Sequence, residues 1–152
     1  MISPLLDGLL DPKHVALDLR GNTVGEVVWE IVELLRESGE LKKPSEFFEA
    51  VMAREEKAST AANGGVAFPH ARTEHVDQIL LGIGRSRKGI VFDGEKDLVH
   101  LIFVIAVPQQ MVNDYLICVG ALARLLGQAG TRQALLAAAT PAEFLDQLRA
   151  EN

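Results

Sequence analysis

Hydrophobic residues recur at helical spacing in two stretches of the first third of the chain. In the first stretch, Thr23 and Glu26 have the spacing of a capping box, so we expect a helix that begins there and ends at Ser38–Gly39. In the second, Ser45 is predicted to cap a helix that runs toward Arg54. The apolar positions on these two helices are Val27, Val28, Ile31, Leu34 and Leu35, followed by Phe47, Phe48, Val51 and Met52.

Shorter apolar runs predict β-strands. Leu98–Val107 is rich in β-branched residues and almost wholly apolar, which is typical of a central strand covered on both faces. Further short strands are expected at His14–Leu19, Val66–Phe68 and Ile79–Gly84, and a turn at Asp93–Gly94. Between them, residues 71–78 are predicted to form a linker and residues 85–89 a basic, solvated turn.

The last third of the chain is predicted to be helical. Tyr115–Leu126 is expected to place Leu116, Val119, Leu122, Ala123 and Leu126 inward. Thr131–Ala139 is the next predicted helix, and the last begins at Thr140 with Pro141 in its first position. Strands and helices interleave irregularly, so residues 1–152 are predicted to form a single α/β domain. Its one mixed β-sheet, of about five strands, is flanked by helices.

Composition narrows the function classes. The formal net charge is −6 over 152 residues, which argues against a nucleic-acid partner. Cys118 is the single cysteine and lies in an apolar run, which excludes an intrachain disulfide and predicts a buried side chain. No ligand cluster suggests a metal or other cofactor. No targeting or membrane segment is visible, which predicts a cytoplasmic protein without direct membrane insertion.

The candidate chemistry lies in the stretch Arg54–Arg72, REEKASTAANGGVAFPHAR. Ser59 and Thr60 supply hydroxyl groups, and Gly64 and Gly65 allow backbone amides to approach an anion. Pro69 then fixes the backbone, so that His70 follows at a stiffened strand end. Neutral imidazole is a suitable phosphoryl acceptor, and Arg54 could offer a bidentate cation. Arg72 could be either a phosphate contact or a solvated side chain.

The order of these residues, RE…(S)T…(N)GG followed by AFPHAR, resembles the active-site segment of one bacterial family. The family that this segment resembles is the fructose/mannitol-class EIIA proteins of the phosphoenolpyruvate-dependent sugar phosphotransferase system. It includes nitrogen-regulatory members. The likeness covers almost all 152 residues. It implies a five-stranded mixed sheet with helices around it and a phosphoryl group carried on His70. It also implies a phosphorylated histidine carrier protein as donor and an EIIB-type domain as acceptor.

One position departs from that family. Many members carry a second histidine at the start of the helix after the central strand, where this chain has Tyr115. A phenol can donate to a phosphate oxygen but cannot become cationic. A regulatory module of the same fold, which binds a kinase, transporter or channel, is therefore the alternative to a sugar-feeding carrier. A hydrolase with His70 as its base is a weaker alternative, because no Ser/His/Asp set is evident.

The other three histidines have structural explanations. His14 is predicted at the surface, His75 in a charged linker, and His100 inside the apolar strand with a hydrogen bond. Arg85, Arg87 and Lys88 form a small basic cluster that is expected to be solvated.

Overall fold

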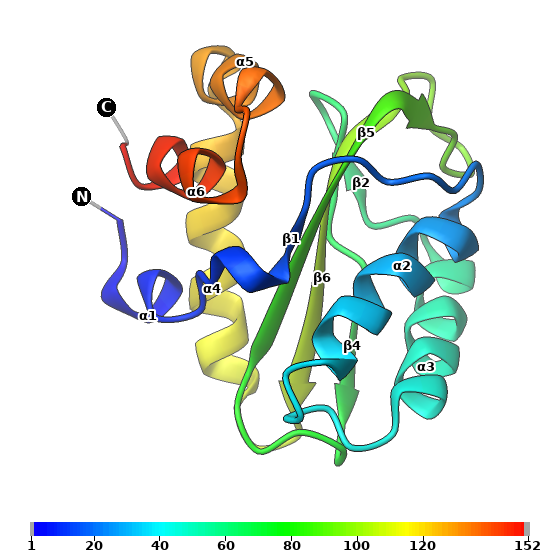
Figure 1. Ribbon diagram of the computed structural model, residues 1–152. Coiled ribbons are helices and arrows are strands. Elements are labelled where there is room, and N and C mark those ends of the chain that lie inside the picture. Colours follow the sequence, from blue (N-terminus) through cyan, green and yellow to red (C-terminus); the bar gives the residue numbers. More distant parts are fainter. Residues whose placement is uncertain (1, 151–152) are drawn as a thin grey trace.

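The computed structural model of the chain describes residues 2–150 and places one mixed β-sheet between two layers of helices (Figure 1). The strands are β1 (Val15–Ala16), β2 (Ala61–Ala62), β3 (Val66–Ala67), β4 (His70–Thr73), β5 (Leu80–Ile90) and β6 (Val99–Pro108). The helices are α1 (Pro4–Asp7), α2 (Val24–Arg36), α3 (Pro44–Lys57), α4 (Val112–Leu126), α5 (Ala129–Ala137) and α6 (Pro141–Arg149), with a 3₁₀ helix, η1 (Pro12–His14). The predicted α/β class with a single mixed sheet is confirmed.

The apolar strand β6 is the centre of the sheet. Its neighbours are β5, which is antiparallel to it, and β3 and β4, which both run parallel to it. The strand order is β1-β5-β6-β3-β2, with β4 also paired to β6. All residues of β6 except His100 are buried, as the run of β-branched residues predicts for a strand covered on both faces.

The strands β3 and β4 occupy one side of β6 in succession. Val66 and Ala67 pair with Leu101 and Ile102, and β4 then pairs from His70 opposite Ile105. Pro69 lies between them and has no N–H to donate, so the ladder is interrupted there while its carbonyl still accepts from the Ile105 amide at 3.0 Å. About five strands were predicted and six are found within residues 2–150, because neither the two-residue β2 nor β4, which follows Pro69, was predicted.

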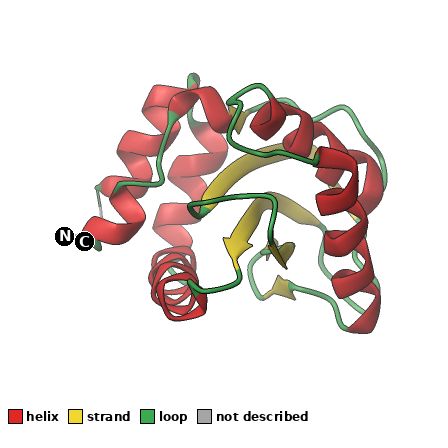
Figure 2. Ribbon diagram, turned by 90° about the horizontal axis from the view of Figure 1, so that it is seen from below, coloured by secondary structure: helices red, strands yellow, loops and turns green. Residues whose placement is uncertain are grey.

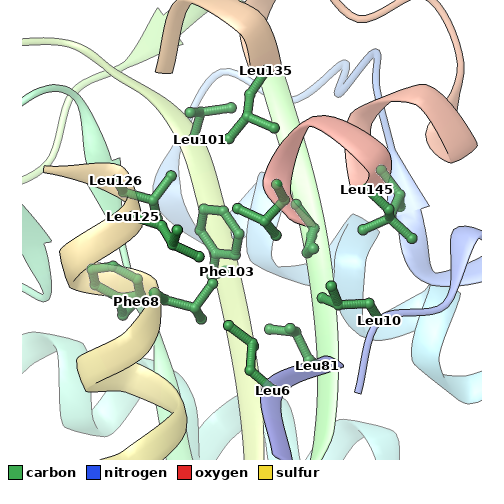
Figure 3. Packing of buried hydrophobic residues seen from close by; sticks show 14 of the residues in the cluster. Leu6, Leu10, Phe68, Leu81, Leu101, Phe103, Leu125, Leu126, Leu135 and Leu145 are labelled. Atoms are coloured by element: carbon green, nitrogen blue, oxygen red, sulfur yellow. The ribbon is translucent and has the colours of Figure 1, made fainter. Parts of the chain in front are cut away.

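Helices cover the two faces of the sheet unequally. Figures 1 and 2 show α2 and α3 on one face and α1, α4, α5 and α6 on the other. The second face carries the larger aromatic and leucine cluster, in which Phe103 of β6 packs against Phe68 with ring centroids 5.8 Å apart (Figure 3). On the first face, α2 approaches β5 closely because Gly82 and Gly84 have no side chains to hold it away.

Side-chain caps are found at the start of the two helices whose N-terminal signals are clearest in the sequence. Thr23 Oγ1 accepts from the Glu26 amide at 3.2 Å, and Thr140 Oγ1 accepts from the Glu143 amide at 3.1 Å. The prediction that Ser45 caps α3 is wrong. Pro44 already occupies the first helical position. A backbone N–H at this position would have no intrahelical acceptor, so proline costs the helix no hydrogen bond there.

Two predicted connections are part of the sheet. Residues 71–73 were assigned to a linker but extend β4, because they pair with β6 as far as Pro108. Residues 85–89 were predicted to be a solvated turn but continue β5, with a register irregularity between Arg85 and Ile90. Arg85 is only 2% exposed, so the prediction of a solvated cluster is wrong for this residue.

The buried face of α4 differs from the predicted one. Leu116 is 56% exposed and Ala123 is exposed, whereas Cys118 and Leu125 are buried with Leu122 and Leu126. The helix begins at Val112, three residues before the predicted start, and the apolar residues on both of its sides made its inward face ambiguous. The burial of Cys118 is confirmed.

The predicted strand at His14–Leu19 is shorter in the structure, which has η1 followed by the two-residue β1. Val15 and Ala16 pair parallel to Ile83 and Gly84 of β5. Between residues 2 and 150, no helix combines the length and the apolar character needed to cross a bilayer.

Candidate functional site

The interruption at Pro69 fixes the ring of His70. Phe68 directly follows β3, and its carbonyl oxygen lies 2.8 Å from Nδ1 of His70, the first residue of β4. A carbonyl oxygen only accepts hydrogen bonds, so Nδ1 carries the proton and the neutral ring has its lone pair on Nε2. The sequence Phe68–Pro69–His70 therefore selects the tautomer as well as the position of the imidazole.

His70 lines a cavity of about 800 Å³ at the end of the sheet where β6 terminates. Three cationic side chains, Arg54, Lys57 and Arg72, contribute to its wall, and no carboxylate from residues 2–150 does. The remaining lining residues are Ala50, Ala53, Ala71, Val107, Gln109, Val112 and Tyr115. A neutral nucleophilic nitrogen thus lies in a cavity whose charged groups are all positive, which suits an anionic reactant.

Arg54 belongs to the last turn of α3 and reaches past the end of the helix. Its Nη1 donates to the carbonyl of Ala58 at 2.8 Å. Lys57 lies three residues further along the same helix, so both cations project on one side of α3. Arg72 comes from β4, two residues after His70, where strand alternation places both side chains on the same face.

The surroundings of His70 lower the pKa of its imidazole. Burial is the largest cause, and the positive charge of Arg54 acts in the same direction. The hydrogen bond to the Phe68 carbonyl and the negative charge of Glu55 oppose them. The net effect keeps His70 neutral at pH 7, which a nucleophilic nitrogen requires.

Tyr115 covers the imidazole from the first turn of α4. The two ring centroids are 5.0 Å apart, and the ring planes are inclined by 34°. Burial raises the pKa of the Tyr115 phenol, while Arg54 lowers it, and the net direction is upward. The phenol therefore stays neutral and offers a hydroxyl donor beside His70.

Four of the residues singled out in the sequence do not line this cavity. Thr60 donates its hydroxyl and its amide to the two carboxylate oxygens of Glu55, at 2.7 and 2.8 Å. Ser59 Oγ accepts from the Ala61 amide at 3.1 Å. Gly64 and Gly65 form the β2–β3 turn, where both have positive φ and where the Gly65 carbonyl accepts from the amides at the start of β6.

The structure brings together His70, Arg54, Arg72 and Tyr115 from three elements, β4, α3 and α4, and adds Lys57. The sequence analysis missed Lys57, although its spacing from Arg54 on a predicted helix could have suggested it. Among the other histidines, His75 Nε2 lies 2.9 Å from the carboxylate of Glu46. His100 Nδ1 lies 2.8 Å from the carbonyl of Ser86, which confirms its predicted hydrogen bond.

Comparison with known proteins agrees with this geometry. Residues 8–151 match the family model described as "Phosphoenolpyruvate-dependent sugar phosphotransferase system, EIIA 2". The phosphotransferase-system fructose-specific EIIABC component of Bacillus subtilis is 30% identical over 139 residues, which are 91% of this chain and 22% of that protein. The chain thus spans about a fifth of the length of that relative.

Two further relatives are matched over nearly their whole length. The nitrogen regulatory protein of Pseudomonas aeruginosa is 29% identical over 145 residues, covering 94% of this chain and 93% of that protein. The crystal structure of nitrogen regulatory protein IIA-Ntr from Neisseria meningitidis superposes with a TM-score of 0.87 at 29% identity, covering 95% of this chain and 99% of the other. With the family match extending over almost every residue, the chain belongs to the EIIA 2 family of the phosphoenolpyruvate-dependent sugar phosphotransferase system.

Proposed function

We propose that this protein is a phosphoryl carrier whose acceptor atom is Nε2 of His70. The observation that carries the proposal is the 2.8 Å contact between Nδ1 and the Phe68 carbonyl, which leaves the lone pair on Nε2. Among residues 2–150 the structure gives Nε2 of His70 no hydrogen-bond partner, so this nitrogen is available for a bond to phosphorus.

The transfer needs no proton to move. The Nε2 lone pair attacks the phosphorus atom of a phosphohistidine donor, and the P–N bond of the donor breaks with its electron pair returning to the donor ring. The His70 ring then carries both the phosphoryl group and its Nδ1 proton, and the resulting positive charge remains hydrogen-bonded to Phe68. In-line positioning and charge compensation are the main requirements of such a transfer.

The cationic wall of the cavity supplies that compensation. A transferred phosphoryl group brings close to two negative charges, which Arg54, Lys57 and Arg72 can share. Tyr115 adds one neutral donor. Thr60 acts only indirectly in this scheme, because its two hydrogen bonds hold the carboxylate of Glu55.

By membership of the family, the donor in this proposal is a histidine phosphocarrier protein and the acceptor is an EIIB-type domain. The exchange would take place in the cytoplasm. The name of the Bacillus subtilis relative, an EIIABC component, supports the pairing of an EIIA unit with an EIIB unit.

A regulatory role is the second candidate, in which the protein binds and controls a transporter, channel or kinase with little sugar phosphotransfer. Two observations favour it. The likeness to nitrogen regulatory proteins extends over nearly their full length, and Tyr115 stands where many sugar-feeding members carry a second histidine.

The proposal is tested by incubating the full chain with phosphoenolpyruvate, enzyme I and the histidine carrier protein. We expect one acid-labile, base-stable phosphoryl group per chain, lost in His70→Ala. His75→Gln is the matched control, because His75 contacts Glu46 and is expected to be dispensable. Labelling that persists in His70→Ala would refute the assignment.

A further inference from the structure

A second imidazole lies at the opposite end of the sheet in similar surroundings. His100 is the second residue of β6, whereas His70 pairs with Ile105, five residues or roughly 16 Å further along the strand. His100 lines a separate cavity of about 240 Å³ with Arg85, Arg87 and Leu136. Figure 1 shows α5, which carries Leu136, at the end of the sheet away from β4.

The ring of His100 is held as that of His70 is held. Its Nδ1 lies 2.8 Å from the carbonyl of Ser86, so Nδ1 carries the proton and Nε2 the lone pair. Glycines flank both carbon edges of the ring: a Cβ on Gly65 would lie 3.8 Å from Cδ2, and one on Gly89 would lie 3.0 Å from Cε1. Nε2 is therefore the polar atom of the ring left for the cavity.

Arg85 brings a buried positive charge to this cavity. Its Nε donates to the carbonyl of Leu17, and its Nη1 donates to the carbonyls of Leu135, Leu136 and Ala138 at 2.8 to 3.2 Å. Within residues 2–150, Nη2 of Arg85 has no hydrogen-bond partner. Every fully buried side-chain nitrogen or oxygen in this range does have a partner, so Nη2 is not fully buried. Arg85 lines the cavity, and Nη2 is the nitrogen of its guanidinium group that is left to bind a ligand there.

Arg87 places a second guanidinium at the rim, two residues further along β5. Its Nε donates to Asp18 Oδ1 at 2.9 Å, and both side chains are largely exposed. This ion pair is weak in water, so the other nitrogens of Arg87 can bind an anion. No carboxylate among residues 2–150 forms an ion pair with Arg85. Its hydrogen bonds go to carbonyl oxygens, and Asp18 acts on it through its charge without such a contact.

We propose that Arg85, Arg87 and His100 form a second binding site, distinct from the His70 cavity, for a phosphate group that retains one P–OH. Two guanidinium groups match the oxygens of phosphate. The Nε2 lone pair accepts a hydrogen bond from P–OH, a donor that an ionised carboxylate does not have. The cavity of about 240 Å³ has room for a phosphate group, and the ligand in this proposal is inorganic phosphate or the phosphate end of a monoester.

The site is tested on the full-length protein by NMR, following the His100 Cε1–H and Arg85 Nε–H signals at constant ionic strength. Inorganic phosphate, methyl phosphate and acetate are the probes. We expect saturable shifts of both signals with phosphate and with methyl phosphate, and none with acetate. Binding of phosphate alone would identify the inorganic ion as the ligand, and equal or tighter binding of methyl phosphate would identify a monoester.

Variants separate this site from general attraction to positive charge. Arg87→Gln should weaken phosphate binding about tenfold, and Asp18→Asn should strengthen it by removing the competing carboxylate. His100→Asn keeps a donor for the Ser86 carbonyl but removes Nε2, so the Arg85 signal should then respond only weakly. Arg36→Gln is the matched control, because Arg36 is also an exposed arginine paired with a carboxylate, Glu33.

Three results would overturn the proposal. The first is the absence of any saturable shift at His100 and Arg85. The second is a response to acetate equal to that to phosphate. The third is a loss of affinity in Arg36→Gln as large as that in Arg87→Gln.

Discussion

The chemistry of His70 depends on its immediate neighbours, each of which acts in a different way. Phe68 decides which ring nitrogen carries the proton, and burial decides that the ring stays neutral. Arg54 has two roles in the proposed transfer: its charge disfavours a protonated imidazole before transfer, and we expect it to stabilise the anion afterwards. Tyr115 gives a neutral hydroxyl where an imidazole would give a titrating group.

The first residue-scale prediction concerns pH. A lowered pKa means that His70 is half-protonated at a pH below the ordinary histidine value of about 6.5. His70 should therefore be neutral and nucleophilic throughout the interval from about pH 6.5 to 8. An NMR titration of its Cε1–H signal, compared with N-acetylhistidine, measures this directly. A midpoint above that of the free imidazole would show that burial does not govern this ring.

Arg54 provides the second prediction. Arg54→Lys keeps the charge but loses the planar fork, so phosphoryl acceptance should slow by about tenfold. Arg54→Ala also loses the charge and should slow it by about a hundredfold. Single-turnover labelling from the phosphorylated histidine carrier gives the rates. Arg124→Ala, on α4 and outside the cavity lining, serves as the control. If Arg54→Ala accepted the phosphoryl group at the wild-type rate, Arg54 would have no role in the transfer and would only donate to the Ala58 carbonyl at the helix end.

Tyr115 leads to the third prediction. Wild type should transfer its phosphoryl group slowly to EIIB domains, because a neutral phenol stabilises the developing anion less than a cationic imidazole. Tyr115→His should raise the rate and introduce a titration between about pH 6 and 8. Tyr115→Phe retains the ring contact and isolates the hydroxyl. If wild type and Tyr115→His transferred at equal rates across this interval, the position would have no influence on the chemistry.

At the scale of secondary structure, sequence patterns predicted an element correctly where a single physical signal dominated. The apolar, β-branched run of β6 and the caps at Thr23 and Thr140 identified their elements correctly. Two strands were missed or shortened because they contain polar residues: β4 has three polar positions, His70, Arg72 and Thr73, and the basic half of β5 resembled a turn. The burial of Arg85 depends on carbonyls about 50 residues away, which no local pattern reveals.

The packing of α2 on β5 gives the fourth prediction. A Cβ on Gly82 would lie 2.6 Å from Cγ2 of Ile31 and 3.1 Å from Cγ of Leu35, so Gly82→Ala should lower the free energy of unfolding by about 1–3 kcal/mol. Gly120 lies in α4 with nothing within 4 Å of a Cβ, and Gly120→Ala should raise it by about 0.5–1 kcal/mol. Urea unfolding measures both variants. Equal stability of the two would contradict the close packing of helix on sheet.

At the scale of the whole molecule, charge is segregated. The formal net charge is −6, yet the charged residues that line the His70 cavity are all cations. The lining residue Arg72 comes from β4 within the sheet, and Arg54 and Tyr115 come from α3 and α4, which lie on opposite faces of the sheet (Figure 1). The sequence analysis identified His70 and three other residues of this lining, Arg54, Arg72 and Tyr115, but the distribution of charge required the folded arrangement. A cationic cavity on an acidic protein favours phosphorylated partners and makes the encounter sensitive to salt.

In the proposed transfer, the hydrogen bond from Nδ1 to the Phe68 carbonyl leaves Nε2 of His70 as the nitrogen that bonds to phosphorus. The most direct test is a long-range ¹H–¹⁵N NMR spectrum of the phosphorylated, ¹⁵N-labelled protein, in which coupling to phosphorus identifies the modified nitrogen. We predict coupling to Nε2 of His70, with Nδ1 still protonated and hydrogen-bonded. Phosphorus on Nδ1 of His70, or on any other histidine, would contradict the account.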